Sequence, residues 1–161
     1  MKDVTQLTEG WSLRHEEALL PARVPGCVHT DLLAAQLIPD PFIGRNEAEI
    51  AWVGRRAWSY VTDLSHDSAH ERTDLVFDGL DTAAEITLAG EVLGTTRNMH
   101  RGYRFDVTGR TGALEVGFAS AYDEAAAVRS VTGERPNVYP SPSSTSARWP
   151  PASAGTGAPP W

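Results

Sequence analysis

The side chains that could bind a metal in this sequence are five histidines, and their spacing does not predict a metal site. His66 and His70 are four residues apart, but they lie in a polar stretch without the helical pattern that would bring both rings to one side. The others stand apart in the sequence, at His15, His29 and His100. We therefore assign no metal ligand and expect no cofactor.

Acidic and thiol chemistry has equally weak candidates. Glu47 and Glu49 are two residues apart, a pattern more typical of a solvated helix start, where carboxylates interact favourably with the helix dipole. The single cysteine, Cys27, follows Gly26 and has no recognisable base partner, so we interpret it as a packed small apolar residue. One cysteine also excludes an internal disulfide framework. We assign no catalytic residue.

Binding residues are also hard to assign. Trp11, Trp52 and Trp58 could be platforms for sugar rings, but in a domain of this size tryptophans more often anchor the core. The stretch Asn98 to Arg101 lies between two expected strands and could face a ligand or a partner domain, although a plain loop is the simpler interpretation. No substrate-binding residue can be assigned from these patterns.

The elements that must position these side chains are mostly strands. Alternating apolar residues and turn signals predict an all-β fold, an antiparallel jelly-roll β-sandwich with one to three short helices. The expected strands are residues 11–14, 57–62, 73–77, 84–88, 91–94, 103–107 and 114–118, with a hairpin turn at Ala89-Gly90. The expected helices begin at Thr30 or Asp31, at Asn46, and at Asp123.

Charge and hydropathy exclude other classes of protein. The 161 residues include 14 Lys and Arg against 21 Asp and Glu, a net charge of −7, with no basic run, so we expect no nucleic-acid partner. No stretch approaches the roughly 18–20 apolar residues of a membrane span, and the first residues lack the apolar core of a signal peptide. We expect a soluble cytoplasmic protein.

The sequence changes character after Pro140. Residues 1–140 have the pattern of one folded domain, whereas 18 of the 21 residues in 141–161 are Ser, Pro, Thr, Ala or Gly. Such a segment buries too little apolar surface to offset its ordering entropy. We predict a disordered tail over 141–161.

Several runs, taken in order, resemble the N-terminal domain of the β-mannosidases of glycoside hydrolase family 2. No run is specific alone, but together they extend from about Trp11 to Pro140. At Ala89 the family usually has Asn, the better turn residue. The runs are residues 24–33, 38–47, 52–53, 58–60, 77–82, 86–90 and 98–107.

The resemblance implies a galactose-binding-like jelly-roll domain of an enzyme that hydrolyses terminal β-linked mannose with retention. In that family the two catalytic glutamates belong to a separate (β/α)₈ barrel, and no residue here corresponds to either. We therefore expect a non-catalytic fragment that is inactive alone. Its partners would be the missing downstream domains, with a β-mannoside as substrate only in the intact enzyme. Trp52, Met99 and Tyr103 are candidates for the face those domains cover.

The family's Gly-Trp-Asp-Trp-Gly-Pro run should follow Pro140 but is absent there, and the tail suggests a hypothesis for its absence. The tail can be read in a shifted frame, in which each codon joins the third base of one tail codon to the first two bases of the next. Read in this frame, the tail can encode Phe-Gly-Trp-Asp-Trp-Gly-Pro-Thr-Leu. The hypothesis is a single-base loss near codon 140, in the gene or in its sequencing, which makes the tail out-of-frame translation. The alternative is a true Pro/Ser/Ala linker.

Two other functions compete with the fragment interpretation. Jelly rolls of this kind often bind glycans, so the chain could be a stand-alone carbohydrate-binding module. It could also be a small interaction domain without a sugar site. The long resemblance, the lack of a secretion signal and the out-of-frame motif all favour the fragment.

Overall fold

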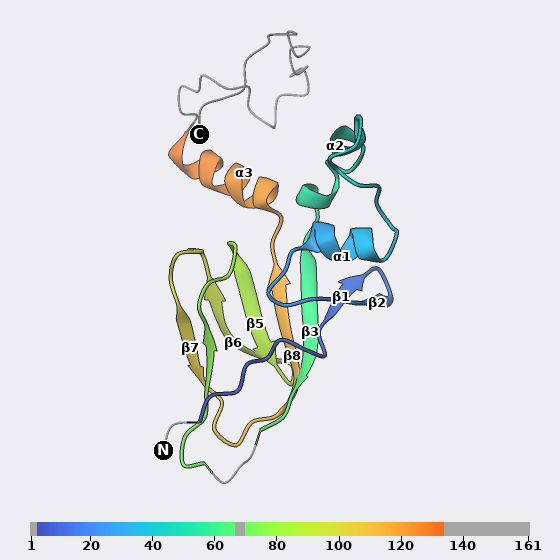
Figure 1. The fold of residues 1–161 in the computed structure, drawn as a ribbon. Helices are drawn as coiled ribbons and strands as arrows, with labels where there is room; N and C mark the ends of the chain where they lie inside the picture. Colours follow the sequence, from blue (N-terminus) through green and yellow to red (C-terminus); the bar gives the residue numbers. More distant parts are fainter. Residues whose placement is uncertain (1–2, 67–69, 134–161) are drawn as a thin grey trace, which may run out of the picture. The chain divides into compact units, whose positions relative to one another are not determined.

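A computed structural model describes residues 3–66 and 70–133, and it contains two antiparallel sheets (Figure 1). The larger sheet has six strands in the order β2-β1-β3-β8-β5-β6, and the smaller one pairs β4 with β7. The larger sheet's bounds are β1 Ser12–His15, β2 Ala18–Pro21, β3 Trp58–Leu64, β5 Ala84–Leu88, β6 Glu91–Thr96 and β8 Gly112–Phe118. The smaller sheet comprises β4 Asp74–Phe77 and β7 Tyr103–Asp106.

Alternation along the strands builds one core. In β5, Ala84, Ile86 and Leu88 are buried while Glu85 between them is exposed. The register places Ile86 opposite Val116 of β8, which in turn faces Tyr60 of β3, so buried side chains line up across three strands. The expected all-β fold is confirmed.

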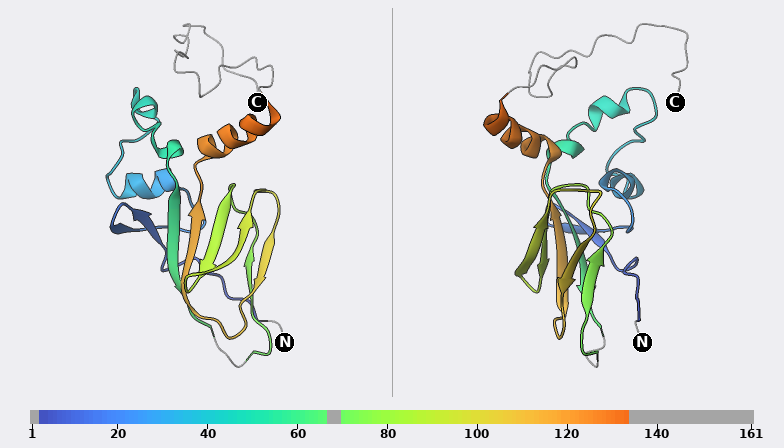
Figure 2. Two further views of the ribbon diagram at one scale, coloured as in Figure 1. Left: turned by 180° about the vertical axis from the view of Figure 1, so that it is seen from behind. Right: turned by 90° about the vertical axis from the view of Figure 1, so that its left-hand side faces the viewer.

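The smaller sheet closes the sandwich over this core. Leu75 of β4 is buried, and Phe77 and Phe105 pack against the core cluster. Their rings meet edge to face with centroids 6.2 Å apart. Figures 1 and 2 both show β7 beside β6. The two sheets therefore share one apolar interior.

The expected hairpin between β5 and β6 is present, and its turn is strained. Ala89 and Gly90 have φ values of 51° and 82°, both in the left-handed region that a two-residue type I′ turn requires. Glycine adopts this conformation freely, whereas an alanine Cβ clashes with its own backbone there. Ala89 is tolerated because the flanking strands impose the turn.

The helices begin earlier than predicted. Helix α1 spans Val28–Ala34 with Cys27 at its N-cap, so Thr30 and Asp31 lie inside the first turn. The Thr30 hydroxyl still serves the helix start, because it accepts a hydrogen bond from the Cys27 N–H at 3.4 Å. The next helix, α2, spans Asn46–Glu49 with Arg45 at the N-cap. The expected cap, Asn46, instead donates its side-chain amide to the Asp40 carbonyl at 2.8 Å.

Two further helical elements complete the fold. A 3₁₀ turn, η1, spans Val53–Arg55 and leads into β3. Helix α3 spans Ala121–Thr132 and contains the expected segment 123–129. The chain separates into two compact units, Met1–Glu124 and Ala125–Trp161, and both sheets, α1, α2 and η1 belong to the first. The predicted tail, 141–161, lies outside the described residues.

Candidate functional site

The structure places the two spaced histidines in separate contacts. The Nε2 atom of His66 lies 2.8 Å from the Arg110 carbonyl oxygen. The Nε2 atom of His70 lies 4.0 Å from the Asp3 carboxylate. Within residues 3–66 and 70–133, no three His, Cys, Asp or Glu side chains are grouped so as to hold a metal ion. His66 and His70 therefore contact different partners, Arg110 and Asp3.

The interpretation of Cys27 as a packed residue is wrong. Its thiol is free and exposed at the start of α1, 3.6 Å from the Thr30 hydroxyl. Glu47 and Glu49 are exposed in the first turn of the four-residue α2, where the sequence predicted a solvated helix start.

Two of the three tryptophans are core anchors, as predicted. Trp11 and Trp58 are only 6% and 8% exposed, and their indole N–H groups donate to the carbonyls of Leu7 at 2.8 Å and Val53 at 2.9 Å. Trp52 is half-buried against the core, with its ring centroid 6.0 Å from that of Trp58. The Arg56 guanidinium lies over the Trp52 ring, 5.2 Å from its centroid. A sugar ring would have to displace this arginine to stack on that face of Trp52.

A groove opens beside Trp52 that the sequence did not predict. The His15 ring stacks on Trp58 at 5.8 Å, and Glu16 lies 4.0 Å from Arg56 across the groove. The groove has a volume of about 330 Å³ and is lined by His15, Glu16, Leu37, Trp52 and Arg56. Its lining combines two ring side chains and one aliphatic side chain with one charge of each sign. Such a lining fits an apolar side chain better than a charged ligand.

The stretch from Asn98 to Arg101 is a loop organised by Tyr103. The Tyr103 hydroxyl accepts hydrogen bonds from the backbone N–H groups of Arg97 and Asn98, at 3.3 and 3.1 Å, and donates to the Asn98 carbonyl at 3.2 Å. Met99 is 43% exposed at the loop surface. The expected interdomain face is therefore exposed at Met99 but half-buried at Trp52 and Tyr103.

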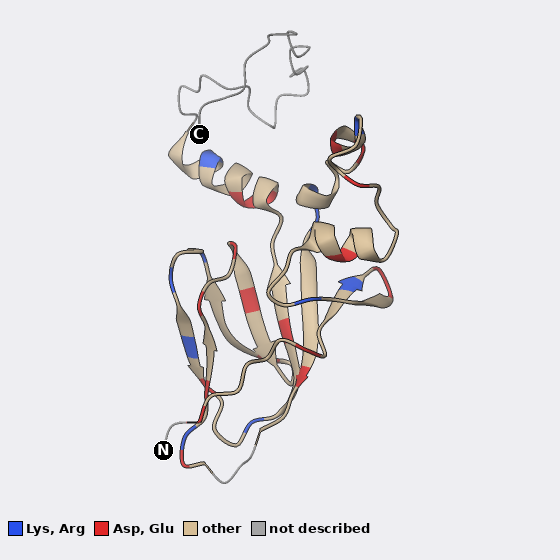
Figure 3. Cartoon of the chain, in the orientation of Figure 1, with Lys and Arg blue, Asp and Glu red and all other residues tan. Residues whose placement is uncertain are grey.

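A second hollow crosses the outer face of the larger sheet. Gly117 lies between Ser59 and Glu85 in the strand register, and its missing side chain leaves a shallow trough of about 400 Å³. The nearby Glu115 is paired with Arg14 at 3.2 Å. Figure 3 shows acidic and basic positions interspersed over the described part of the chain. The trough is lined by the carboxylates of Glu85 and Glu115 and by the hydroxyls of Ser59 and Thr87.

The buried carboxylate of this domain is structural. Asp31, expected as a helix cap, instead turns inward from α1, where Oδ1 accepts the Arg23 N–H at 3.1 Å and Oδ2 accepts the Tyr60 hydroxyl at 2.8 Å. The pKa of Tyr60 is raised well above its ordinary value, mainly because the hydroxyl is buried. The hydrogen bond to Asp31 and the negative charge of Asp31 raise it further. Asp31 thereby ties the loop before α1 to β3.

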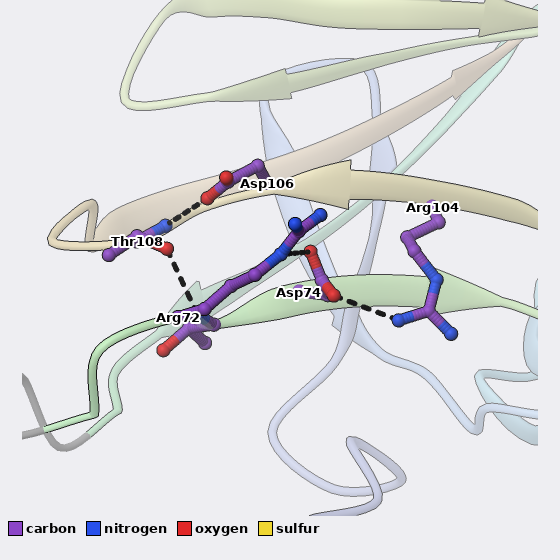
Figure 4. Close-up of polar contacts among 6 residues, drawn as sticks. Arg72, Asp74, Arg104, Asp106 and Thr108 are labelled. Atoms are coloured by element: carbon purple, nitrogen blue, oxygen red, sulfur yellow. Dashed lines mark hydrogen bonds and ion pairs between the residues drawn. The ribbon is translucent and has the colours of Figure 1, made fainter.

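Charged residues on the smaller sheet form surface pairs (Figure 4). Asp74 lies between Arg72 at 3.1 Å and Arg104 at 2.8 Å, and the hydrogen bond from Arg104 is the main reason its pKa is lowered. Hydrogen bonds from the Thr108 hydroxyl and N–H lower the pKa of Asp106. Both carboxylates are thus held ionised, the opposite of what a general acid requires.

The fold defines a class: an antiparallel β-sandwich domain. Residues 11–158 match the family model described as glycosyl hydrolase 2 galactose-binding domain-like. The chain belongs to this family, as the resemblance predicted.

Relatives and solved structures agree with this assignment. β-Mannosidase A of Emericella nidulans is 38% identical over 121 residues, which cover 69% of this chain and 13% of that protein. The β-mannosidase of Bos taurus is 37% identical over 100 residues, covering 60% and 11%. The crystal structure of β-D-mannosidase from Dictyoglomus thermophilum aligns with a TM-score of 0.78 at 31% identity, covering 83% of this chain and 18% of that one. The chain therefore spans a small part of the length of these relatives.

In the described part of the chain, no helix combines the length and the apolar character needed to cross a membrane. The exposed helix residues include acidic side chains in the first turns of α2 and α3.

Proposed function

We propose that this chain is the N-terminal, non-catalytic domain of a β-mannosidase-type retaining glycoside hydrolase. The observation that carries the proposal is its match, at 31–38% identity, to a small part of much longer β-mannosidases. The activity, hydrolysis of terminal β-D-mannose residues, would belong to the intact enzyme. The partners of this domain would be the other domains of the same polypeptide, and the setting would be cytoplasmic, without nucleic acid or membrane.

The chemistry of retention supports an inactive domain. Such an enzyme needs one carboxylic acid to protonate the leaving oxygen and a second carboxylate, about 5 Å away, to attack the anomeric carbon. Asp74 and Asp106 have lowered pKa values and lie in surface contacts. Asp31 accepts two hydrogen bonds inside the domain. We therefore propose that the catalytic pair is supplied by another part of the enzyme.

Two measurements test the proposal: an assay of hydrolysis by the purified chain, and the nucleotide sequence of the gene. Purified chain should not hydrolyse an aryl β-mannoside, and the nucleotide sequence beyond codon 140 should encode the rest of the hydrolase in the neighbouring frame. The tail 141–161 would then be out-of-frame translation. Turnover that disappears when an acidic residue of this chain is changed would overturn the proposal of an inactive domain.

A stand-alone carbohydrate-binding module is not favoured by the aromatic residues. Trp11 and Trp58 are buried, and Trp52 is covered by Arg56 on one ring face. Titration of the chain with mannobiose and with cellulose or mannan oligosaccharides separates the two proposals. Saturable binding that depends on Trp52 would favour the module.

A further inference from the structure

The later turns of helix α3 are exposed. Residues 125–132 are exposed apart from the half-buried Arg129, and no residue of α3 is buried. The compact unit that contains both sheets ends at Glu124, inside this helix. A helix of this length is marginally stable on its own in water, because fixing the first turn costs more entropy than its hydrogen bond offsets. Helix formation in residues 125–132 therefore depends on the contacts that fix the first turn of α3.

Hydrogen bonds cap the backbone at both ends of α3. The Ser120 hydroxyl accepts the Asp123 N–H at 3.3 Å, as an N-cap residue does, and donates to the Gly54 carbonyl of η1 at 3.4 Å. Gly133, with φ 77°, follows the last turn, and its N–H donates to the Arg129 carbonyl at 2.9 Å. Ser120 thus fixes where the helix begins and ties that point to η1.

Two side-chain contacts hold the first turn of α3 against other elements of the same compact unit. The Arg55 guanidinium of η1 lies over the Tyr122 ring, with Cζ 4.8 Å from the ring centroid. A Cβ added to Gly54 would lie 3.3 Å from Tyr122 Cε2, so the ring packs closely on η1. The Glu124 carboxylate accepts a hydrogen bond from Nη1 of Arg97, the residue after β6, at 2.8 Å. Each contact joins an arginine outside α3 to a side chain in its first turn.

We propose that these two contacts, Arg55 on Tyr122 and Arg97 on Glu124, form a salt-sensitive latch that keeps residues 125–132 helical. Both contacts involve a charge near the surface, and the Arg97 side chain is 71% exposed, so dissolved ions screen them. At low ionic strength the latch is closed and the first turn nucleates the rest of α3. At high ionic strength the latch opens and residues 125–132 lose their helical structure. This conformational switch does not depend on the proposed function.

Amide hydrogen exchange of the full 161-residue chain tests the latch. The double variant Arg55→Gln/Arg97→Gln removes both cations and leaves the sequence of α3 unchanged, so the intrinsic helix propensity of α3 is the same in both proteins. Pulsed labelling followed by mass spectrometry should show residues 125–132 exchanging about three- to tenfold faster in the variant, since exposed ion pairs and cation–π contacts each contribute modestly. Exchange in β8 should stay at the parent rate.

The matched control is Arg14→Gln/Arg110→Gln, which removes the same number of charges from two other exposed ion pairs. It should leave exchange in residues 125–132 at the parent rate. Salt provides a second comparison, because raising the ionic strength from about 0.01 M to about 1 M shortens the Debye length from about 30 Å to about 3 Å. The parent should then exchange as fast as the Arg55→Gln/Arg97→Gln variant, whose own rate should change little.

Three results would overturn the latch. The first is equal exchange of residues 125–132 in the parent and the Arg55→Gln/Arg97→Gln variant. The second is an equal acceleration in β8, because the two arginines would then stabilise the whole sandwich and not α3 in particular. The third is an acceleration of the same size in the Arg14→Gln/Arg110→Gln control, which would assign the effect to the net charge of the protein.

Discussion

Strands β5 and β8 differ from the helical segment of residues 28–56 in how much of their large apolar side chains they leave exposed. Along β5 and β8, Ile86, Leu88 and Leu114 are completely buried. In the helical segment, Ile38, Ile50 and Val53 are buried, but Phe42 and Ile43 face outward on a hydrogen-bonded loop. Ile86, Leu88 and Leu114 are therefore covered within the domain, whereas Phe42 and Ile43 are not. Substitutions in β5 and β8 should therefore lower stability more than substitutions at Phe42 and Ile43.

The largest expected effect is in the sheet. Leu114→Ala removes a fully buried side chain from the central strand β8 and should lower the free energy of unfolding of the isolated chain by about 2–5 kcal/mol. Urea denaturation followed by tryptophan fluorescence measures the loss. A loss below about 1 kcal/mol would mean that β8 is not the centre of the core.

A smaller effect is expected where α1 meets the sheet. Asp31→Ala leaves the Arg23 N–H and the Tyr60 hydroxyl without their acceptor and should cost about 1–3 kcal/mol. The same denaturation experiment applies, with Asp63→Ala, an exposed carboxylate on β3, as the control. Equal losses in the two variants would contradict a specific role for the buried carboxylate.

The pH dependence of stability tests the same contact. The pKa of Tyr60 is raised in the folded state, so its contribution to stability is fully present below the unfolded tyrosine value of about 10. Above that pH the unfolded state loses the proton while the folded state keeps it, and stability should fall as pH rises. Tyr60→Phe should make the decline between pH 9 and 11 shallower. An unchanged slope would show that Tyr60 ionises freely in the folded protein.

The hairpin turn offers a stabilising change. Ala89→Asn should raise the free energy of unfolding by about 0.5–1 kcal/mol, because asparagine tolerates the left-handed conformation that Ala89 adopts at φ 51°. Ala119→Asn, at another exposed alanine after β8, is the matched control. The prediction fails if both variants shift stability alike.

The smallest effect is expected at Phe42 and Ile43, on the loop between α1 and α2. Phe42→Ser/Ile43→Ser should change the free energy of unfolding by no more than about 0.5 kcal/mol, because both side chains are already exposed. Comparison with Leu114→Ala in the same chain sharpens the contrast between the two regions. A loss comparable to that of Leu114→Ala would show that the loop belongs to the core.

The alternation of apolar and polar residues predicted most of the strands. It did not predict strand β2, and the helix starts were predicted too late in the sequence. Residues 84–88 and 114–118 were expected as strands, and both are, because one face of each is buried and the other is solvated. Strand β2, Ala18–Pro21, was missed, since its two adjacent leucines break the alternation. Helix α1 begins at Val28 because the hydroxyl of Thr30 can satisfy the Cys27 N–H from within the first turn.

The sequence by itself determined the antiparallel sandwich, the core positions of Trp11 and Trp58, and the resemblance to the glycoside hydrolase family. These follow from local patterns, since side chains alternate across a strand regardless of what lies elsewhere in the fold. Only the tertiary structure decided that Cys27 is exposed, that Asp31 turns inward to Tyr60, and that Phe42 and Ile43 are exposed. Burial at these positions depends on which distant segments cover them, and an apolar residue has the same sequence signal whether it is covered by its own domain or by another.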